Sequence, residues 1–134
     1  MKEVCIIGAG VAGLAAARYL RECFKVTIYE ASSTIGGIWY YNKGDASVFN
    51  GVKPTPMYKN LRTNLPKQLM SFRDLDYDDD IPTFPTHGQV MDYLEKYCTK
   101  FGVINDIQFS HPVLSVKPWL QDDTLKWLIK TPKG

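Results

Sequence analysis

The sequence lacks the features that mark several large classes of protein. It has three cysteines in 134 residues, an odd number, and Cys5, Cys23 and Cys98 show no metal-ligand spacing. We therefore expect neither a disulfide framework nor a metal site, and predict that the thiols are reduced and buried, in a reducing compartment.

Long apolar runs and clusters of charge are also missing. No apolar stretch approaches the length of a membrane-spanning helix, and the first predicted strand begins within three residues of Met1, which leaves no room for a secretory signal. The net charge is +2, with Lys and Arg scattered, so nucleic acid and a polybasic membrane surface are not expected as partners. These absences favour a soluble cytoplasmic protein, and they leave homo-oligomer formation open.

The densest charge is acidic, at residues 73–80, which include five aspartates. The glycine and the terminal glutamate of an EF-hand are absent from this run. It therefore predicts a solvated, self-repelling loop, and the segment from Asn42 to Pro56, rich in Gly, Pro, Asn and Ser, predicts irregular surface.

The first 30 residues contain the strongest motif in the chain. Val4–Ile7 predicts a buried strand, and three glycines follow it at the spacing G-x-G-x-x-G. Gly8 permits a tight turn, Gly10 lets a pyrophosphate approach the backbone, and Gly13 lets a helix predicted from about Gly10 to Cys23 pack closely on the sheet. The free N–H groups at the start of that helix form an anion site, and Arg18, Arg21 and Glu22 are expected on the wet, solvent-facing side of the helix. The predicted phosphate loop is Gly8, Ala9, Gly10, Val11, Ala12 and Gly13.

A second predicted strand, Lys25–Glu30, ends in an acid. The Glu30 carboxylate is expected to accept hydrogen bonds from both ribose hydroxyls of the dinucleotide and to repel a 2′-phosphate. Ala31, Ser32 and Ser33 supply no arginine to reverse that preference. The site therefore suits FAD or NAD, although a βαβ turn without a ligand would share the pattern.

Two further segments contain candidate site residues. Gly36 and Gly37 precede an aromatic cluster that begins at Trp39, and adjacent glycines permit close approach to a ligand, although an ordinary loop with a core tryptophan fits equally well. Asn64 precedes Leu65 and Pro66, and its amide can donate and accept at once beside a flavin or nicotinamide, although asparagine near proline is commonly a turn residue.

The second half of the chain predicts packing elements. Thr86 and Gln89 form a T-x-x-Q capping box at the start of a helix that ends at Gly102. Val113–Lys117 and Leu125–Thr131 predict an antiparallel hairpin around an acidic turn. The chain shows no third parallel strand, so we expect the open α/β sheet to be incomplete. His87 and His111 are expected to be structural.

Together these segments resemble the N-terminal part of a flavin-containing monooxygenase. The resemblance covers almost the whole chain and leans towards insect enzymes that N-oxygenate plant alkaloids. Its G-G-x-W and Thr-Asn elements are more specific than the dinucleotide motif. The segments that carry it are Gly8–Gly13, Glu30, Ile35–Trp39, Tyr58–Pro66 followed by Met70 and Phe72, and Phe84–His87 leading into Tyr93 and Leu94.

The resemblance implies an α/β, Rossmann-like FAD-binding domain with a parallel sheet, incomplete at its C-terminus, plus a β-hairpin. It implies that NADPH reduces FAD, that O2 adds to the reduced flavin as a C4a-hydroperoxide, and that a soft nitrogen or sulfur nucleophile, an amine or a sulfide, takes up the oxygen. Gly8–Gly13 and Glu30 would hold the ADP half, and Gly37, Ile38 and Trp39 would lie along the flavin-bearing half. Thr63, Asn64 and Leu65 would lie near the isoalloxazine and NADP, with Asn64 as the catalytic residue that steadies the oxygenated flavin.

The family's second glycine motif, which binds NADPH, does not occur in the 134 residues. We therefore predict that residues 1–134 are the N-terminal part of an FAD-binding domain, that the NADPH-binding domain is absent, and that this chain alone is inactive. Two alternatives remain: a truncated, non-catalytic FAD- or NAD-binding module, and a fragment of another flavin or NAD oxidoreductase.

Overall fold

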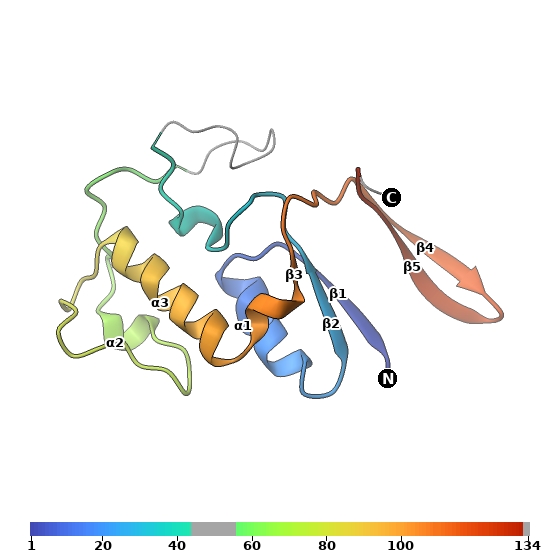
Figure 1. Cartoon of the computed structure of the whole chain (residues 1–134), viewed down its shortest axis with the longest axis horizontal. Helices are drawn as coiled ribbons and strands as arrows, with labels where there is room; N and C mark the ends of the chain where they lie inside the picture. The colour runs from blue at the N-terminus through green and yellow to red at the C-terminus, as the bar shows by residue number, and fades with distance from the viewer. Residues whose placement is uncertain (44–55, 133–134) are drawn as a thin grey trace.

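A parallel sheet forms the base of the predicted nucleotide site. The computed structural model describes residues 1–43 and 56–132, so most of the predicted irregular segment 42–56 lies outside the described residues. Strands β1 (Glu3–Ile7) and β2 (Lys25–Tyr29) pair in parallel, and β2 pairs in parallel with β3 (Ile107–Gln108). The order within the described part is β1-β2-β3, one half of a Rossmann-type sheet (Figure 1).

The expectation that no third parallel strand exists was wrong. β3 has only two residues, with Ile107 opposite Ile28 and Gln108 opposite Tyr29. A strand of two residues is too short to show the alternation of apolar and polar residues that predicts a strand from sequence. It forms because the helical segment before it ends beside the free edge of β2. The predicted α/β class, with a parallel sheet and a hairpin, is confirmed.

Helix α1 (Val11–Leu20) packs against β1 and β2. Its fully buried residues, Leu14 and Ala17, lie one turn apart, so a narrow stripe of leucine and alanine faces the sheet. The helix ends three residues earlier than predicted, and residues 21–24 form a turn into β2.

Helix α3 (His87–Lys100) provides most of the remaining core. The predicted capping box is present: Gln89 N donates to Thr86 Oγ1 at 3.3 Å and Thr86 N donates to Gln89 Oε1 at 2.9 Å. Gly102 takes a φ of +68° after the helix, as a C-terminal stop requires, and leads into the 3-10 helix η3 (Val103–Asp106). Tyr97 and Leu94 are buried on the face that α3 turns towards the rest of the fold.

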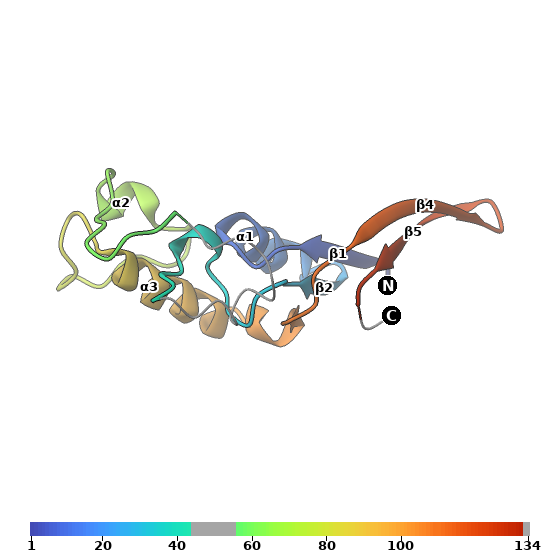
Figure 2. The ribbon, with the colours of Figure 1, turned by 90° about the horizontal axis from the view of Figure 1, so that it is seen from above.

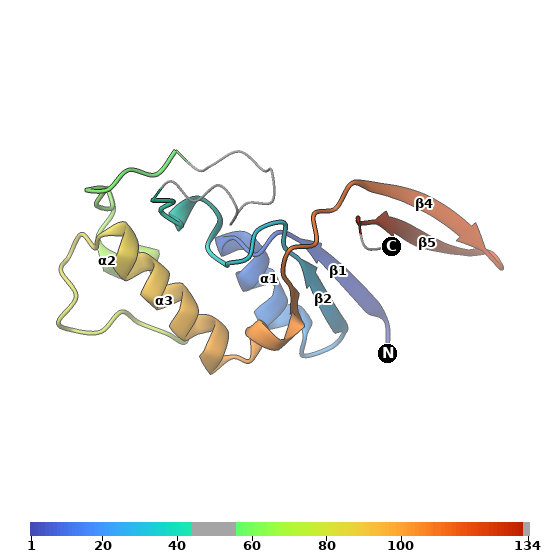
Figure 3. The ribbon, with the colours of Figure 1, turned by 45° about the horizontal axis from the view of Figure 1, so that its top comes forward.

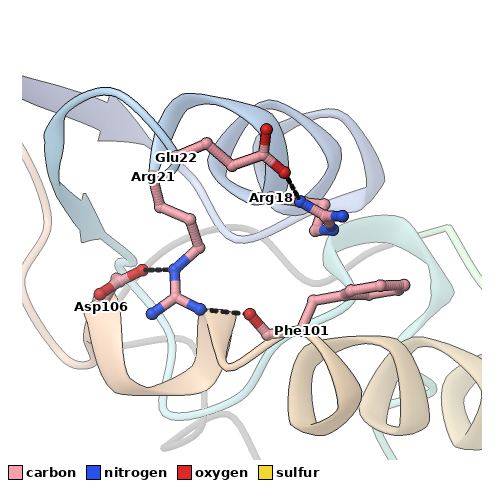
Figure 4. Close-up of polar contacts among 5 residues, drawn as sticks. All are labelled: Arg18, Arg21, Glu22, Phe101 and Asp106. Atoms are coloured by element: carbon pink, nitrogen blue, oxygen red, sulfur yellow. Dashed lines mark hydrogen bonds and ion pairs between the residues drawn. The ribbon is translucent and has the colours of Figure 1, made fainter.

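Arg21 joins α1 to the end of α3, although its place in the sequence suggested the wet side of the first helix. Its Nε donates to Asp106 Oδ2 at 3.0 Å, and its Nη1 donates to the Phe101 carbonyl (Figure 4). Arg18, one turn earlier, pairs with Glu22 and lies with its guanidinium carbon 4.5 Å from the centroid of the Phe101 ring. The two arginines therefore hold together elements about 80 residues apart in sequence.

The five aspartates of residues 73–80 are exposed, as predicted, but Leu75 and Tyr77 between them are buried in the core. Basic side chains also hold the backbone of this segment. Lys67, the first residue of helix α2 (Lys67–Met70), donates from Nζ to the carbonyls of Asp78, at 2.8 Å, and Ile81, at 2.6 Å. Lys96 pairs with Asp78 at 2.6 Å. Among the described residues, no cluster of His, Cys, Asp and Glu could hold a metal ion.

The hairpin of β4 (Ser115–Gln121) and β5 (Thr124–Lys130) extends away from the rest of the molecule (Figures 2 and 3). Asp122 and Asp123 both have positive φ, which gives the two-residue turn that suits a hairpin. The strands begin and end differently from the prediction, because pairing continues through Pro118 to Gln121. One face of the hairpin is wholly apolar, and it consists of Val116, Ile129, Pro118, Trp127, Leu120 and Leu125.

The three cysteines are free thiols, and they differ in exposure. Cys98 is buried in α3 and Cys5 is partly buried in β1, but Cys23 is exposed, so the expectation that all three are buried was wrong. Cys23 is exposed because the chain has left α1 by that point and is turning towards β2. Within the described residues, no helix is long and apolar enough to cross a membrane.

Two buried side chains of α3 that can lose a proton, Tyr97 and Cys98, predict a loss of stability at alkaline pH. Burial raises the pKa of Tyr97 from 10.0 to about 12 and that of Cys98 from 9.0 to about 12. The folded state therefore holds protons that the unfolded chain has lost, and its stability falls as pH rises from about 9 towards 12. Urea unfolding should show this decline, and Tyr97→Phe should make it shallower. Tyr58→Phe, at an exposed tyrosine, is the matched control, and an equal decline in both variants would contradict the assignment.

Candidate nucleotide-binding site

The glycine loop connects the end of β1 to the start of α1. Gly8 has a φ of +95°, a conformation that side chains rarely adopt, and its N–H donates to the Tyr29 carbonyl at 2.8 Å. This bond ties the loop to the end of β2. Gly10 is the N-cap of α1, and because glycine has no side chain, it cannot block the N–H groups of the first turn.

Gly13 makes the close helix–strand contact that the motif predicts. A Cβ built on Gly13 would overlap the carbonyl oxygen of Gly8 and lie 3.1 Å from its carbonyl carbon. Both atoms belong to the backbone of the glycine loop. The helix can therefore start this close to the loop only with glycine at this position.

The second glycine pair packs directly onto the first loop. Gly36 N donates to the Ala9 carbonyl at 2.9 Å, and a Cβ on Gly37 would lie 3.2 Å from Gly10 Cα. Gly36 and Gly37 have φ values of +100° and +55°. The structure thus brings together the two glycine-rich segments, and the resulting surface is backbone without side chains.

Glu30 follows β2 and faces the glycine loop. Its Oε2 accepts from Ala9 N at 2.6 Å, and its Oε1 accepts from the N–H and the hydroxyl of Ser32, both at 2.8 Å. The carboxylate is thus fixed beside the loop, as expected of a residue that binds the adjacent ribose. These three hydrogen bonds use three of the roughly four acceptor positions of the carboxylate. The prediction that Glu30 accepts from both ribose hydroxyls would require two free positions.

The start of α1 is suited to an anion. Its first turn, Val11 to Leu14, carries no charged side chain, and its N–H groups point out of the helix end. Among the described residues other than Gly8 and its two chain neighbours, no heavy atom lies within 4 Å of the position that a Cβ on Gly8 would take. There is therefore open space beside the loop, next to amides that bind phosphate oxygens in this geometry.

The 3-10 helix η1 (Gly37–Trp39) extends the site away from Glu30. Ile38 is exposed, whereas Trp39 is half-buried and packs against the core. Trp39 and Val11 lie on the wall of an apolar cavity of about 220 Å³. The other lining residues are Met70, Phe72, Tyr77, Val90, Tyr93 and Leu94.

The Thr-Asn segment is anchored to the start of α3. Thr63 is buried, its N–H donates to the Pro85 carbonyl at 2.9 Å, and its hydroxyl donates to the Leu65 carbonyl at 2.8 Å. These bonds hold the turn while Asn64 and Leu65 remain exposed. The first of these two bonds fixes the backbone of this segment against the start of α3, and neither of them joins the segment to the glycine loop or to Glu30.

Sequence reasoning missed Ser32, which was considered only as a position without an arginine. It is buried and makes two of the three hydrogen bonds to the Glu30 carboxylate. A detectable signal existed, because a serine two residues after an acid can form a local bond between hydroxyl and carboxylate.

The sheet, the glycine loop and the acid after β2 are those of the Rossmann-type fold that commonly binds dinucleotides. A family model described as flavin-binding monooxygenase-like matches residues 1–131. The chain belongs to this family, and the predicted resemblance to flavin-containing monooxygenases is confirmed.

Relatives in plants and insects show similar identity. The chain is 35% identical to flavin-containing monooxygenase FMO GS-OX4 of Arabidopsis thaliana, over 99% of this chain and 31% of that protein. It is 36% identical to senecionine N-oxygenase of Tyria jacobaeae, over 93% of this chain and 27% of that protein. These values do not separate the insect from the plant relatives, so the leaning towards insect enzymes stays a prediction.

Solved structures have the same fold. S-allyl-L-cysteine S-oxygenase from Allium sativum matches with a TM-score of 0.76 and 34% identity, over 94% of this chain and 34% of that one. An oxidized steroid monooxygenase bound to NADP matches with a TM-score of 0.74 and 25% identity, over 100% of this chain and 24% of that one. The chain spans between 24% and 34% of these four proteins. It spans 86% of one short relative, putative flavin-containing monooxygenase FMO GS-OX-like 11 of Arabidopsis thaliana, at 35% identity.

Proposed function

We propose that this chain is the FAD-binding portion of an NADPH- and O2-dependent flavin monooxygenase that oxygenates soft nitrogen or sulfur nucleophiles. The observation that carries the proposal is the contact between the two glycine segments beside Glu30. Gly37 lies close enough to Gly10 that a Cβ there would be 3.2 Å from Gly10 Cα, so bare backbone faces the phosphate site. The family and the named S- and N-oxygenases among the relatives support the reaction class.

The residues present fit FAD. The amides of Gly10–Gly13 would hold the pyrophosphate, Glu30 would hold the adenosine ribose, and Gly37, Ile38 and Trp39 would lie along the flavin-bearing half. Thr63, Asn64 and Leu65 would lie at the isoalloxazine end. When bound, the flavin supplies the electron transfer from NADPH to O2. The protein would bind and orient the flavin and exclude water, and the exposed Asn64 amide can both donate and accept hydrogen bonds.

Residues 1–134 are the N-terminal part of the FAD domain in this proposal. The NADPH-binding glycine motif does not occur in them, so FAD binding is expected of this chain and turnover is not. The second candidate function is a non-catalytic nucleotide-binding module. The observation behind that alternative is a relative of similar length, named a putative flavin-containing monooxygenase, of which this chain spans 86%.

Flavin titration tests the proposal. Purified chain titrated with FAD should quench flavin fluorescence and give a visible flavin spectrum after gel filtration, whereas NAD should compete weakly. Addition of NADPH and a sulfide such as thioanisole should give no sulfoxide. Binding of NAD without FAD would favour a dehydrogenase fragment. Sulfoxide formation would show that the 134 residues suffice for catalysis.

A further inference from the structure

Ser32 holds one oxygen of the acid that faces the nucleotide site. It is 7% exposed, and both its N–H and its hydroxyl lie 2.8 Å from Glu30 Oε1. The neighbouring Ser33 is exposed, so the two serines offer the same side chain in opposite environments.

The two oxygens of Glu30 have different roles, because the protein occupies their acceptor positions unequally. A carboxylate oxygen offers about two lone-pair positions. Ser32 occupies both positions on Oε1, while Ala9 N, at 2.6 Å, occupies one on Oε2. The remaining acceptor position is on Oε2, the oxygen next to the glycine loop.

The Ser32 hydroxyl has a second acceptor within reach. Its Oγ lies 2.7 Å from the Thr34 carbonyl and 2.8 Å from Glu30 Oε1, and it has one proton to donate. A carboxylate is the stronger acceptor, because hydrogen bonds to an ionised group are roughly twice as strong as neutral ones. The proton is therefore held by Glu30, and the Thr34 carbonyl limits the rotation of the hydroxyl to two positions.

We propose that Ser32 is a positioning residue of the nucleotide site. By occupying Oε1 it fixes the Glu30 carboxylate so that Oε2 alone accepts a ribose hydroxyl of an adenine dinucleotide. This inference rests on the proposed FAD site. It differs from the sequence expectation, in which both ribose hydroxyls bond to Glu30.

The test compares two ligands in two serine variants. The ligands are FAD and an FAD analogue whose adenosine ribose lacks both hydroxyls. Ser32→Ala should raise the Kd for FAD about fivefold, the effect of losing one well-placed hydrogen bond, and leave the Kd for the analogue unchanged. Ser33→Ala is the matched control and should change neither value. A merely structural defect would raise both Kd values by the same factor.

A ligand-free measurement separates this inference from the proposed function. Amide hydrogen exchange by NMR should show Ala9 N–H exchanging about tenfold faster in Ser32→Ala, because the carboxylate that accepts from it keeps only the backbone bond from residue 32 and loses the hydroxyl bond. If the wild type binds FAD, the inference would be overturned by a Ser32→Ala variant that raises the Kd values for FAD and for the analogue by the same factor, or that changes neither. If the wild type binds neither ligand, the proposed function fails, and unchanged exchange at Ala9 would then overturn the role of Ser32.

Discussion

Gly13→Ala is expected to remove about 4 kcal/mol or more of unfolding free energy, which is a large part of the total stability of a domain of this size. The added Cβ would overlap the Gly8 carbonyl oxygen and lie 3.1 Å from the carbonyl carbon. Neither atom is the end of a flexible side chain, so the helix or the loop must move. Urea unfolding followed by circular dichroism measures the loss.

The same substitution in the other long helix is the control. Gly88 is the second residue of α3, and a Cβ there would meet only Thr86 Oγ1, at 3.9 Å. Gly88→Ala should therefore stabilise the protein, by up to about 1 kcal/mol, because alanine is the better helix former. If the two variants unfolded at the same urea concentration, the close helix–loop contact would not be a feature of the folded protein.

The parts of the site predicted from sequence are those in which local chemistry and tertiary structure require the same residues. Gly8, Gly10 and Gly13 have separate backbone reasons for being glycine, and each follows from the turn between a strand and a helix. The capping box of Thr86 and Gln89 is a local motif of the same kind, and the structure has it at the predicted residues.

The missed features depend on partners distant in sequence. β3 is two residues long and is a strand only because the edge of β2 lies beside it. Arg21 was expected on the wet side of α1, but it bonds to Asp106 and Phe101, which are about 80 residues away. No periodicity within a short window contains such information.

Glu30→Gln is expected to weaken FAD binding about 30-fold, the range for losing a hydrogen bond to a charged group. The substitution keeps the shape and replaces one acceptor oxygen by an NH2 group. Two backbone N–H groups, from Ala9 and Ser32, point at different oxygens of the carboxylate. In either orientation the amide therefore places a donor against a backbone donor, and we expect a further loss of about 1–3 kcal/mol in unfolding free energy.

Glu22→Gln separates this effect from a general loss of charge. Glu22 lies on α1, its side chain is 58% exposed, and it pairs with Arg18, so neutralising it should alter stability by less than about 0.5 kcal/mol. The decisive comparison uses ADP-ribose and its 2′-phosphate. Removing the charge of Glu30 removes its repulsion of a 2′-phosphate, so the preference for ADP-ribose should fall in Glu30→Gln and stay unchanged in Glu22→Gln. An unchanged preference in both variants would show that Glu30 stabilises the glycine loop without selecting the nucleotide.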